Sequence, residues 1–184
     1  MNFNQEAGLI NAKISNIENL ILKWGEAAGP FLSIEPLIRY IAELHKPMRD
    51  KVSDLIKTDK STKNKQYIHY SDCNPKYLVG AIESIFGNQI SSEDLTQICK
   101  YHLLRDKFLH GNFIALMEIM GVEPTSRTYE SSGKRKKLKP GEIYESFLSM
   151  ERNDVFGKLR RYSSEVKQAL KKIIQSLAIW NTLF

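Results

Sequence analysis

Apolar residues recur at intervals of three and four along most of this chain, and no segment shows the strict alternation of apolar and polar residues that is typical of a strand. The clearest case is the first: Ile10, Ile14, Ile17, Ile21 and Trp24. Such spacing places side chains on one face of an α-helix. The pattern therefore predicts an all-α fold in which helices bury their apolar faces.

Residues that start, break or cap helices divide this pattern into segments. The motif GPF at 29–31 is expected to end the first helix, and Pro47 is expected to kink or break the second. Ser91 resembles the first residue of a capping box. It starts a helix whose periodicity allows continuation past Gly111. A last helix is expected over about 155–182.

Two segments, about 57–75 and 121–140, show no helical period and are expected to be long loops. The 184 residues are enough for one domain with a sizeable core, so a single domain over 1–184 is expected. The predicted architecture is an antiparallel helical bundle with these two loops.

Composition narrows the class of protein. Hydrophobic residues make up 42% of the chain and charged residues 26%, which excludes a disordered chain. No apolar run approaches the roughly 20 residues that a membrane span needs, and the polar N-terminus does not resemble a signal peptide. Cys73 and Cys99 form no CxxC pair and are expected to be reduced thiols. We therefore expect a cytoplasmic protein without a membrane partner, a metal site or a cofactor.

The stretch YHLLRDKFLHGNF, residues 101–113, carries polar residues in an unexpected place. His102, Asp106 and His110 are spaced i, i+4 and i+8, so they form one row on a helix. A helical wheel places this row in the middle of the apolar side, flanked by Arg105. Burying such groups without partners costs several kcal/mol. We therefore expect this face to meet polar partners, a second chain or a ligand.

The residue types in this row fit RNA cleavage without a metal. An imidazole can remove the proton of a ribose 2′-hydroxyl near neutral pH, and a guanidinium can bind the phosphate. Asp106 could orient the ring of His110 or hold the guanidinium of Arg105. A simpler interpretation is that His110 only precedes a Gly111 C-cap and that Arg105 and Asp106 form structural ion pairs.

The segment RDKFLHG at 105–111 resembles the R-x4–6-H motif of HEPN domains, in which a polar residue commonly follows the Arg, as Asp106 does. The helical pattern around the motif is similar too, so the resemblance covers most of the chain. It implies an α-helical bundle that dimerises and brings two motif copies into one composite site. Many members of this family are metal-independent endoribonucleases of toxin–antitoxin, abortive-infection or related defence systems. Others have lost catalysis and serve as binding or scaffold domains.

The resemblance implies that Arg105, His110 and Asp106 are catalytic, with RNA as substrate and products that end in a 2′,3′-cyclic phosphate and a 5′-hydroxyl. His102 and Asn112 are candidates for supporting roles. The expected partners are RNA, a second copy of the chain and an antitoxin protein. In members paired with a nucleotidyltransferase antitoxin, a Tyr two residues after the His can be modified. That position is Asn112 here, so this modification is not expected.

A second match to the bare motif occurs at Arg39 and His45. On a helical wheel Arg39 points to solvent, whereas His45 lies in the apolar stripe. A Tyr follows this Arg instead of a small polar residue. We interpret the match as a coincidence and His45 as a core histidine.

Basic and aromatic residues in the two loops are candidates for RNA binding. Lys and Arg outnumber Asp and Glu by 27 to 21, a net charge of +6 that favours a polyanionic partner. Lysines and arginine in a run can bind phosphates, and tyrosines can stack on unpaired bases. The candidates are Lys134, Arg135, Lys136, Lys137, Lys139, Tyr67 and Tyr70. A solvated loop and rings packed on the bundle are the simpler interpretations.

Two other functions remain open from the sequence. One is a non-catalytic module that binds RNA or a protein through the polar row. The other is a structural dimer whose polar faces pair with each other.

Overall fold

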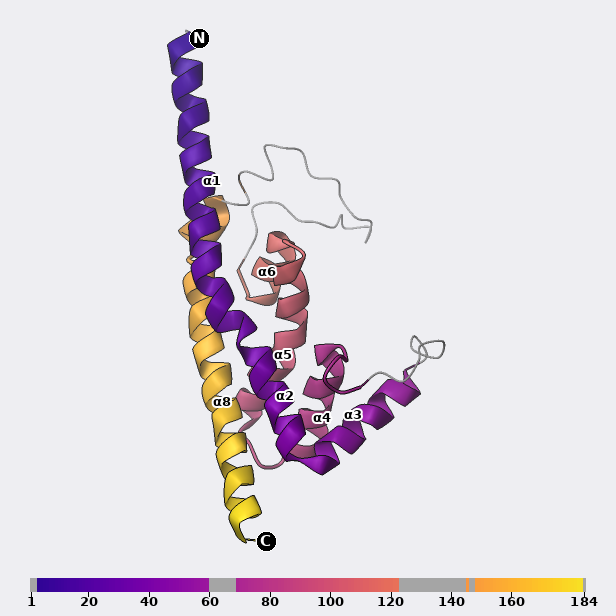
Figure 1. The fold of residues 1–184 in the computed structure, drawn as a ribbon. Helices are drawn as coiled ribbons and strands as arrows, with labels where there is room; N and C mark the ends of the chain where they lie inside the picture. Colours follow the sequence, from indigo (N-terminus) through magenta and orange to yellow (C-terminus); the bar gives the residue numbers. More distant parts are fainter. Residues whose placement is uncertain (1–2, 60–68, 123–144, 146–147, 184) are drawn as a thin grey trace. The chain divides into compact units, whose positions relative to one another are not determined.

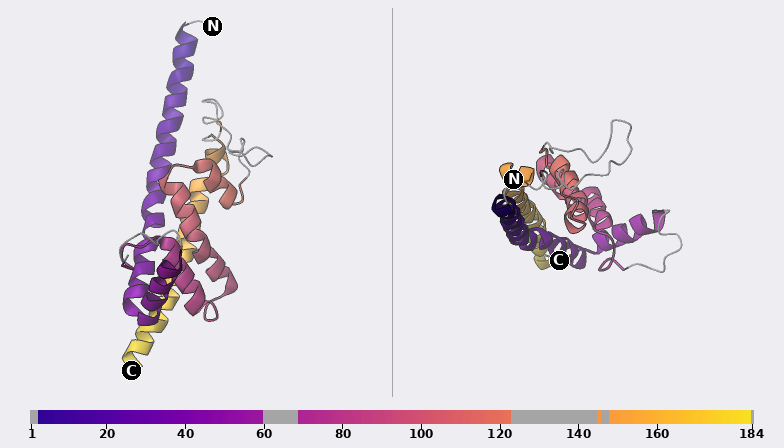
Figure 2. Two further views of the ribbon diagram at one scale, coloured as in Figure 1. Left: turned by 90° about the vertical axis from the view of Figure 1, so that its right-hand side faces the viewer. Right: turned by 90° about the horizontal axis from the view of Figure 1, so that it is seen from above.

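The computed structural model of the chain describes residues 3–59, 69–122, 145 and 148–183. Throughout these residues the regular secondary structure is helical, and none of them lies in a strand (Figure 1 and Figure 2). The prediction of an all-α fold is therefore confirmed. The finer prediction of an antiparallel bundle stays a prediction.

The helices begin and end close to the predicted boundaries, with exceptions at Gly29 and Gly111. They are α1 (Phe3–Leu32), α2 (Ile34–Leu44), α3 (Lys46–Thr58), α4 (Pro75–Phe86), α5 (Ser92–Leu109), α6 (Phe113–Ile119) and α8 (Val155–Leu183). The predicted loop at 57–75 is seen at Asp59 and at 69–74, and the rest of it lies outside the described residues. Beyond Val122, the predicted loop at 121–140 also lies outside them.

The expected end of the first helix at Gly29-Pro30 is wrong. α1 continues through Pro30 to Leu32. The proline lacks an N–H and breaks one helical hydrogen bond, but the buried residues Ala27 and Phe31 on either side hold the turn in the core. The Ser33 hydroxyl then donates a hydrogen bond of 2.8 Å to the Pro30 carbonyl, which satisfies one of the last acceptors of the helix.

The predicted break at Pro47 and the predicted start at Ser91 are confirmed. His45 has an extended backbone between α2 and α3, and Pro47 occupies the first turn of α3, where no N–H is needed. The Ser91 hydroxyl accepts a hydrogen bond of 3.1 Å from the Asp94 amide before α5.

The chain forms two compact units. Unit 1 contains Met1–Gly29 and Asp106–Arg160, and unit 2 contains Pro30–Arg105 and Arg161–Phe184. Three helices, α1, α5 and α8, pass from one unit into the other. The expectation of a single domain stays a prediction, and each unit is described by itself.

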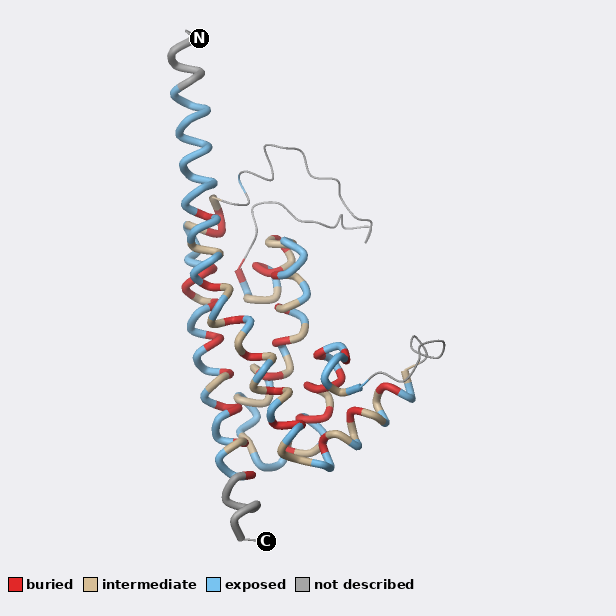
Figure 3. The backbone as a smooth tube through the Cα atoms, in the orientation of Figure 1, coloured by how far each residue is buried: buried red, intermediate tan, exposed pale blue. Residues whose placement is uncertain are grey.

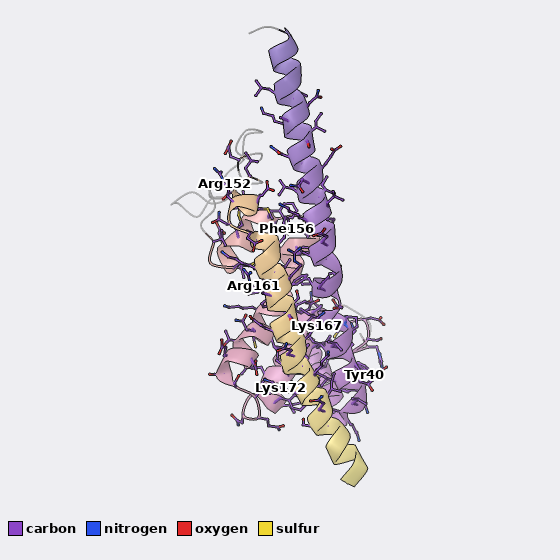
Figure 4. The ribbon with its side chains drawn as sticks, turned by 90° about the vertical axis from the view of Figure 1, so that its left-hand side faces the viewer. Tyr40, Arg152, Phe156, Arg161, Lys167 and Lys172 are labelled. Atoms are coloured by element: carbon purple, nitrogen blue, oxygen red, sulfur yellow. The ribbon has the colours of Figure 1, made fainter. Side chains whose placement is uncertain are left out.

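In unit 2, α3 packs against α4, and α2 packs against both. The residues that fill this core are completely buried: Ile38, Ile41, Met48, Val52, Leu78 and Ile82. The second part of α8 is held to α5 through polar contacts. The Tyr162 hydroxyl donates to the Gln97 carbonyl (2.7 Å), and Lys172 pairs with Asp94 (3.1 Å). Figure 4 labels Lys167 and Lys172 on this part of α8.

In unit 1, the second half of α1 is packed and the first half is not. The indole of Trp24 stacks on Phe108 with 5.4 Å between ring centroids. Lys23 pairs with Glu151 (2.6 Å), which lies in a short helical stretch at 148–152. Residues 8–19 of α1 are exposed (Figure 3), so the expectation that the first apolar face is buried is wrong for its N-terminal half.

Candidate functional site

The helix that carries the motif ends at the motif, and this end is sharply defined. Gly111 has a φ of 62°, in the left-handed region that favours glycine. The Asn112 amide donates to the Lys107 carbonyl (2.9 Å) and the Gly111 amide to the Phe108 carbonyl (3.2 Å). These two bonds form a Schellman motif, so continuation of the helix past Gly111 is wrong. His110 therefore lies at the C-terminal end of α5.

Replacing Gly111 with Ala is expected to lower the free energy of unfolding by about 1 kcal/mol, because an L-residue adopts the left-handed conformation at this cost. Sterics add little, since a Cβ atom here would meet only a carbon of Phe113 at 3.9 Å. Urea unfolding measures the change. Gly25→Ala, inside α1 with open space around it, is the control and is expected to raise stability. Equal stability of the parent and Gly111→Ala would contradict the role of this cap.

Asp106 and His110 lie one turn apart and both reach solvent. The distance from Nε2 of His110 to Oδ1 of Asp106 is 3.5 Å, and the other oxygen of Asp106 accepts a hydrogen bond from Lys107 (2.9 Å). The His110 side chain is 76% exposed and that of Asp106 is 52% exposed. A carboxylate at this position can orient the imidazole, while the open side of the ring stays accessible to a substrate.

The prediction that the polar row lies in the middle of a buried face is wrong. The face of α5 that is buried, with at most 2% exposure, consists of Ile98, Tyr101, Leu104 and Phe108. His102 is half-buried, and Asp106 and His110 are exposed. Leu103 and Leu109 are not part of this face, since they are 46% and 45% exposed. Aromatic residues supply the buried surface instead, so the polar groups reach water and the expected desolvation cost does not arise.

Arg105 belongs to unit 2, because the boundary between the units falls between Arg105 and Asp106. Its Nε donates a hydrogen bond of 3.1 Å to Oε2 of Glu35 on α2. The other oxygen of Glu35 binds Arg39, with Nη2 at 2.5 Å and Nε at 3.2 Å. Glu35 therefore holds two guanidinium groups. Among the described residues, the hydrogen bond to Glu35 through Nε is the one that Arg105 forms. Its two Nη atoms form the edge of the guanidinium that can bind a ligand.

The prediction that Arg39 points to solvent is wrong. Besides binding Glu35, its guanidinium donates hydrogen bonds to the carbonyls of Tyr70 (2.7 Å) and Cys73 (3.0 Å). Arg39 thus fastens the segment before α4 to α2. His45, the other half of this second motif match, packs its ring against Phe86 at 5.2 Å. Burial, with a smaller contribution from the charge of Arg49, lowers the pKa of His45.

The supporting candidates have local structural partners. Nδ1 of His102 lies 2.9 Å from the Cys99 carbonyl of its own helix. The Asn112 side chain accepts a hydrogen bond of 3.2 Å from the Ala115 amide and caps α6. The ring of Tyr70 lies 4.2 Å from that of His69. The remaining RNA-binding candidates lie outside the described residues: Tyr67, Lys134, Arg135, Lys136, Lys137 and Lys139.

Sequence reasoning missed Glu35. The spacing of Glu35 and Arg39 at i and i+4 on one helix is a visible signal for an ion pair. No local signal joins Glu35 to Arg105, which follows 70 residues later. Glu35 comes to share its carboxylate with Arg105 only in the folded protein, where both residues belong to unit 2.

An apolar cavity of about 590 Å³ lies beside the helix end in unit 1. Its walls come from α1, the end of α5, α6 and the start of α8, where Figure 4 labels Phe156. The wall includes Ile17, Ile21, Trp24, Leu109 and His110. His110 is the ionisable side chain of this wall, so a group that enters the cavity meets an imidazole there.

Among the described residues, no group of three or more His, Cys, Asp and Glu side chains could hold a metal ion. Nor is any described helix long and apolar enough to cross a membrane. Both cysteines are free thiols, and burial raises the pKa of Cys73 and of Cys99.

Comparison of the chain with protein-family models, curated proteins and solved structures found no match.

Proposed function

We propose that this protein is a metal-independent endoribonuclease of HEPN type, which acts as a homodimer in a toxin–antitoxin or phage-defence system. The observation that carries the proposal is the exposed imidazole of His110, placed at a capped helix end with the Asp106 carboxylate 3.5 Å from its Nε2. The charge of the chain, +6, favours an RNA partner.

In the proposed reaction, His110 accepts the proton of a ribose 2′-hydroxyl. The 2′-oxygen then forms a bond to the neighbouring phosphorus, and the bond from phosphorus to the 5′-oxygen breaks. The leaving 5′-oxygen takes up a proton from solvent water and the imidazolium of His110 returns its proton to solvent, which gives a 2′,3′-cyclic phosphate and a 5′-hydroxyl. Asp106 orients the ring of His110, and the Nη edge of Arg105 offsets the charge that builds on the phosphate. Glu35 supports this role by holding Arg105 through Nε.

Incubation of the purified chain with single-stranded RNA in excess EDTA tests the reaction class. Cleavage is expected to proceed at the same rate with and without EDTA, because the proposed chemistry uses side chains alone. The 3′ end of the products is expected to resist phosphorylation, because a cyclic phosphate already blocks it. The 5′ end is expected to accept phosphate, because it carries a free hydroxyl. Intact RNA, or products with 5′-phosphates, would contradict the proposal.

A non-catalytic RNA-binding module is the second candidate. It is favoured by the net charge of +6, which attracts RNA whether or not Arg105, paired with Glu35, stabilises a reacting phosphate. RNA binding that survives His110→Ala, weakens with added salt and occurs without cleavage would favour this function.

A further inference from the structure

The N-terminal half of α1 carries an apolar stripe that the described part of the fold does not cover. The stripe, here called the α1 seam, consists of Ile10, Ile14, Ile17 and Ile21, which are 57%, 49%, 38% and 58% exposed. Figure 3 shows residues 8–19 of α1 as exposed. Single exposed apolar residues are common, but a continuous stripe of isoleucines marks an interaction site.

The spacing along the α1 seam is that of a coiled coil. The intervals are four, three and four, and Trp24 adds a further interval of three. In the same register the sequence places Ala7 and Phe3 before Ile10. In a heptad whose positions are lettered a to g, these seven residues alternate between positions a and d over about three heptads. Apolar residues at a and d are the pattern by which one helix packs along another in a coiled coil.

At its C-terminal end the seam register meets the protein itself, because Trp24 stacks on Phe108. The polar contacts that hold α1 lie on a different face. Asn19 and Lys23 bind Glu151 at 3.1 and 2.6 Å, and Glu26 pairs with Arg160 at 3.2 Å. Asn19, Lys23 and Glu26 follow one another at intervals of four and three, on the side of the helix opposite the α1 seam. The packing of unit 1 is therefore compatible with a second helix on the seam.

We propose that the α1 seam binds the same seam of a second copy of this chain, with the two helices parallel. Lys13 and Glu18 flank the seam at the g and e positions. In a parallel coiled coil, a g residue of one helix faces the following e residue of its partner. Lys13 of each copy therefore faces Glu18 of the other copy, which gives two such pairs. In an antiparallel coil, g faces g and e faces e, and these two opposite charges do not meet.

The charge of α1 argues against a membrane surface as the occupant. Lys13 and Glu18 are the charged residues between positions 8 and 22, and the other polar residues there are Asn and Ser. A helix that lies on anionic lipid has a strongly basic polar face. A neutral face with one complementary pair fits a copy of itself.

The α1 seam continues into the cavity beside His110. Ile17 and Ile21 line that cavity together with Leu109 and His110. A second copy packed on the seam would reach the edge that carries His110. Parallel packing also places both copies of His110 at the same end of the coil. The association itself does not rest on RNA cleavage, but it would supply the second motif copy that a composite site needs.

Sedimentation equilibrium over a dilution series tests the association. The parent chain is expected at a multiple of the monomer mass of 21.2 kDa, and Ile14→Asp at the monomer mass. The matched control is Leu22→Asp, an equally apolar and 67% exposed position of α1 outside the seam, which is expected to keep the parent mass. Isoleucine at both a and d tolerates more than two strands, so a dimer or a higher multiple supports the proposal.

A charge exchange tests the parallel orientation. Lys13→Glu and Glu18→Lys are each expected to weaken association, and the double variant is expected to restore it. His110→Ala is expected to leave the mass unchanged, so loss of cleavage and loss of association are separate outcomes. A monomeric parent, as when another segment or protein covers the seam, overturns the proposal. So does an Ile14→Asp variant that keeps the parent mass, or a double variant that stays weak.

Discussion

Replacing His110 with Ala is expected to lower the rate of RNA cleavage by roughly 10²–10⁴-fold, which is the usual contribution of a positioned general acid or base. The imidazole is the group proposed to accept the 2′-hydroxyl proton, and no other side chain of unit 1 is proposed for this step. The loss should appear in single-turnover rates measured with excess protein, because those rates report the chemical step.

The control for this prediction is His69→Ala. His69 is also exposed, and its ring lies 2.8 Å from the Ser71 hydroxyl in the turn before α4, so its removal changes the same residue type at a distant position of the sequence. The His69 variant is expected to cleave at the parent rate. Because His110 is 76% exposed, its replacement should leave the helical circular dichroism unchanged. Equal cleavage by the parent and His110→Ala would show that the activity belongs to another site or to a contaminant.

Replacing Glu35 with Ala is expected to lower the free energy of unfolding by about 2–3 kcal/mol, because two partly buried guanidinium groups lose their shared carboxylate. The Glu35 side chain is 17% exposed, and those of Arg39 and Arg105 are 24% and 30% exposed. Water therefore screens the charges in part, and the expected loss is below that of a fully buried pair. Urea unfolding measures the change.

Glu43→Ala is the matched control, because Glu43 is an exposed acid on the same helix. Its replacement is expected to change stability by less than about 0.5 kcal/mol. Equal effects of the two variants would mean that Glu35 is no more than a surface charge. At temperatures where Glu35→Ala is folded, its cleavage rate should still be reduced, since Arg105 is no longer held through Nε.

Local signals in the sequence predicted many of the helices. The last helix was expected over about 155–182 and is seen as α8, in which Leu159, Tyr162, Val166 and Leu170 are buried. The break expected at Pro47 is present, because the missing N–H of proline acts within its own helix and confines Pro47 to the first turn of α3. Pro30 was misread, since packing of the residues beside it outweighs the lost hydrogen bond.

The candidate site was predictable only in part. The motif residues and the Gly111 cap are visible in the sequence, because a glycine after a helical pattern is a local signal. The row of His102, Asp106 and His110 was correctly seen as one face of a helix, but the direction of that face was wrong. Periodicity tells which residues share a face, whereas the neighbouring helices decide which face is buried.

The sequence by itself determined that the described chain is helical, where most helices begin and end, and which residues form the α1 seam, because these properties depend on residues a few positions apart. The tertiary structure alone decided that Glu35 holds Arg105, that Tyr101 and Phe108 rather than Leu103 and Leu109 are buried, and that the α1 seam is exposed. Ion pairs and burial depend on groups that lie far apart in the sequence and become neighbours only when the chain folds.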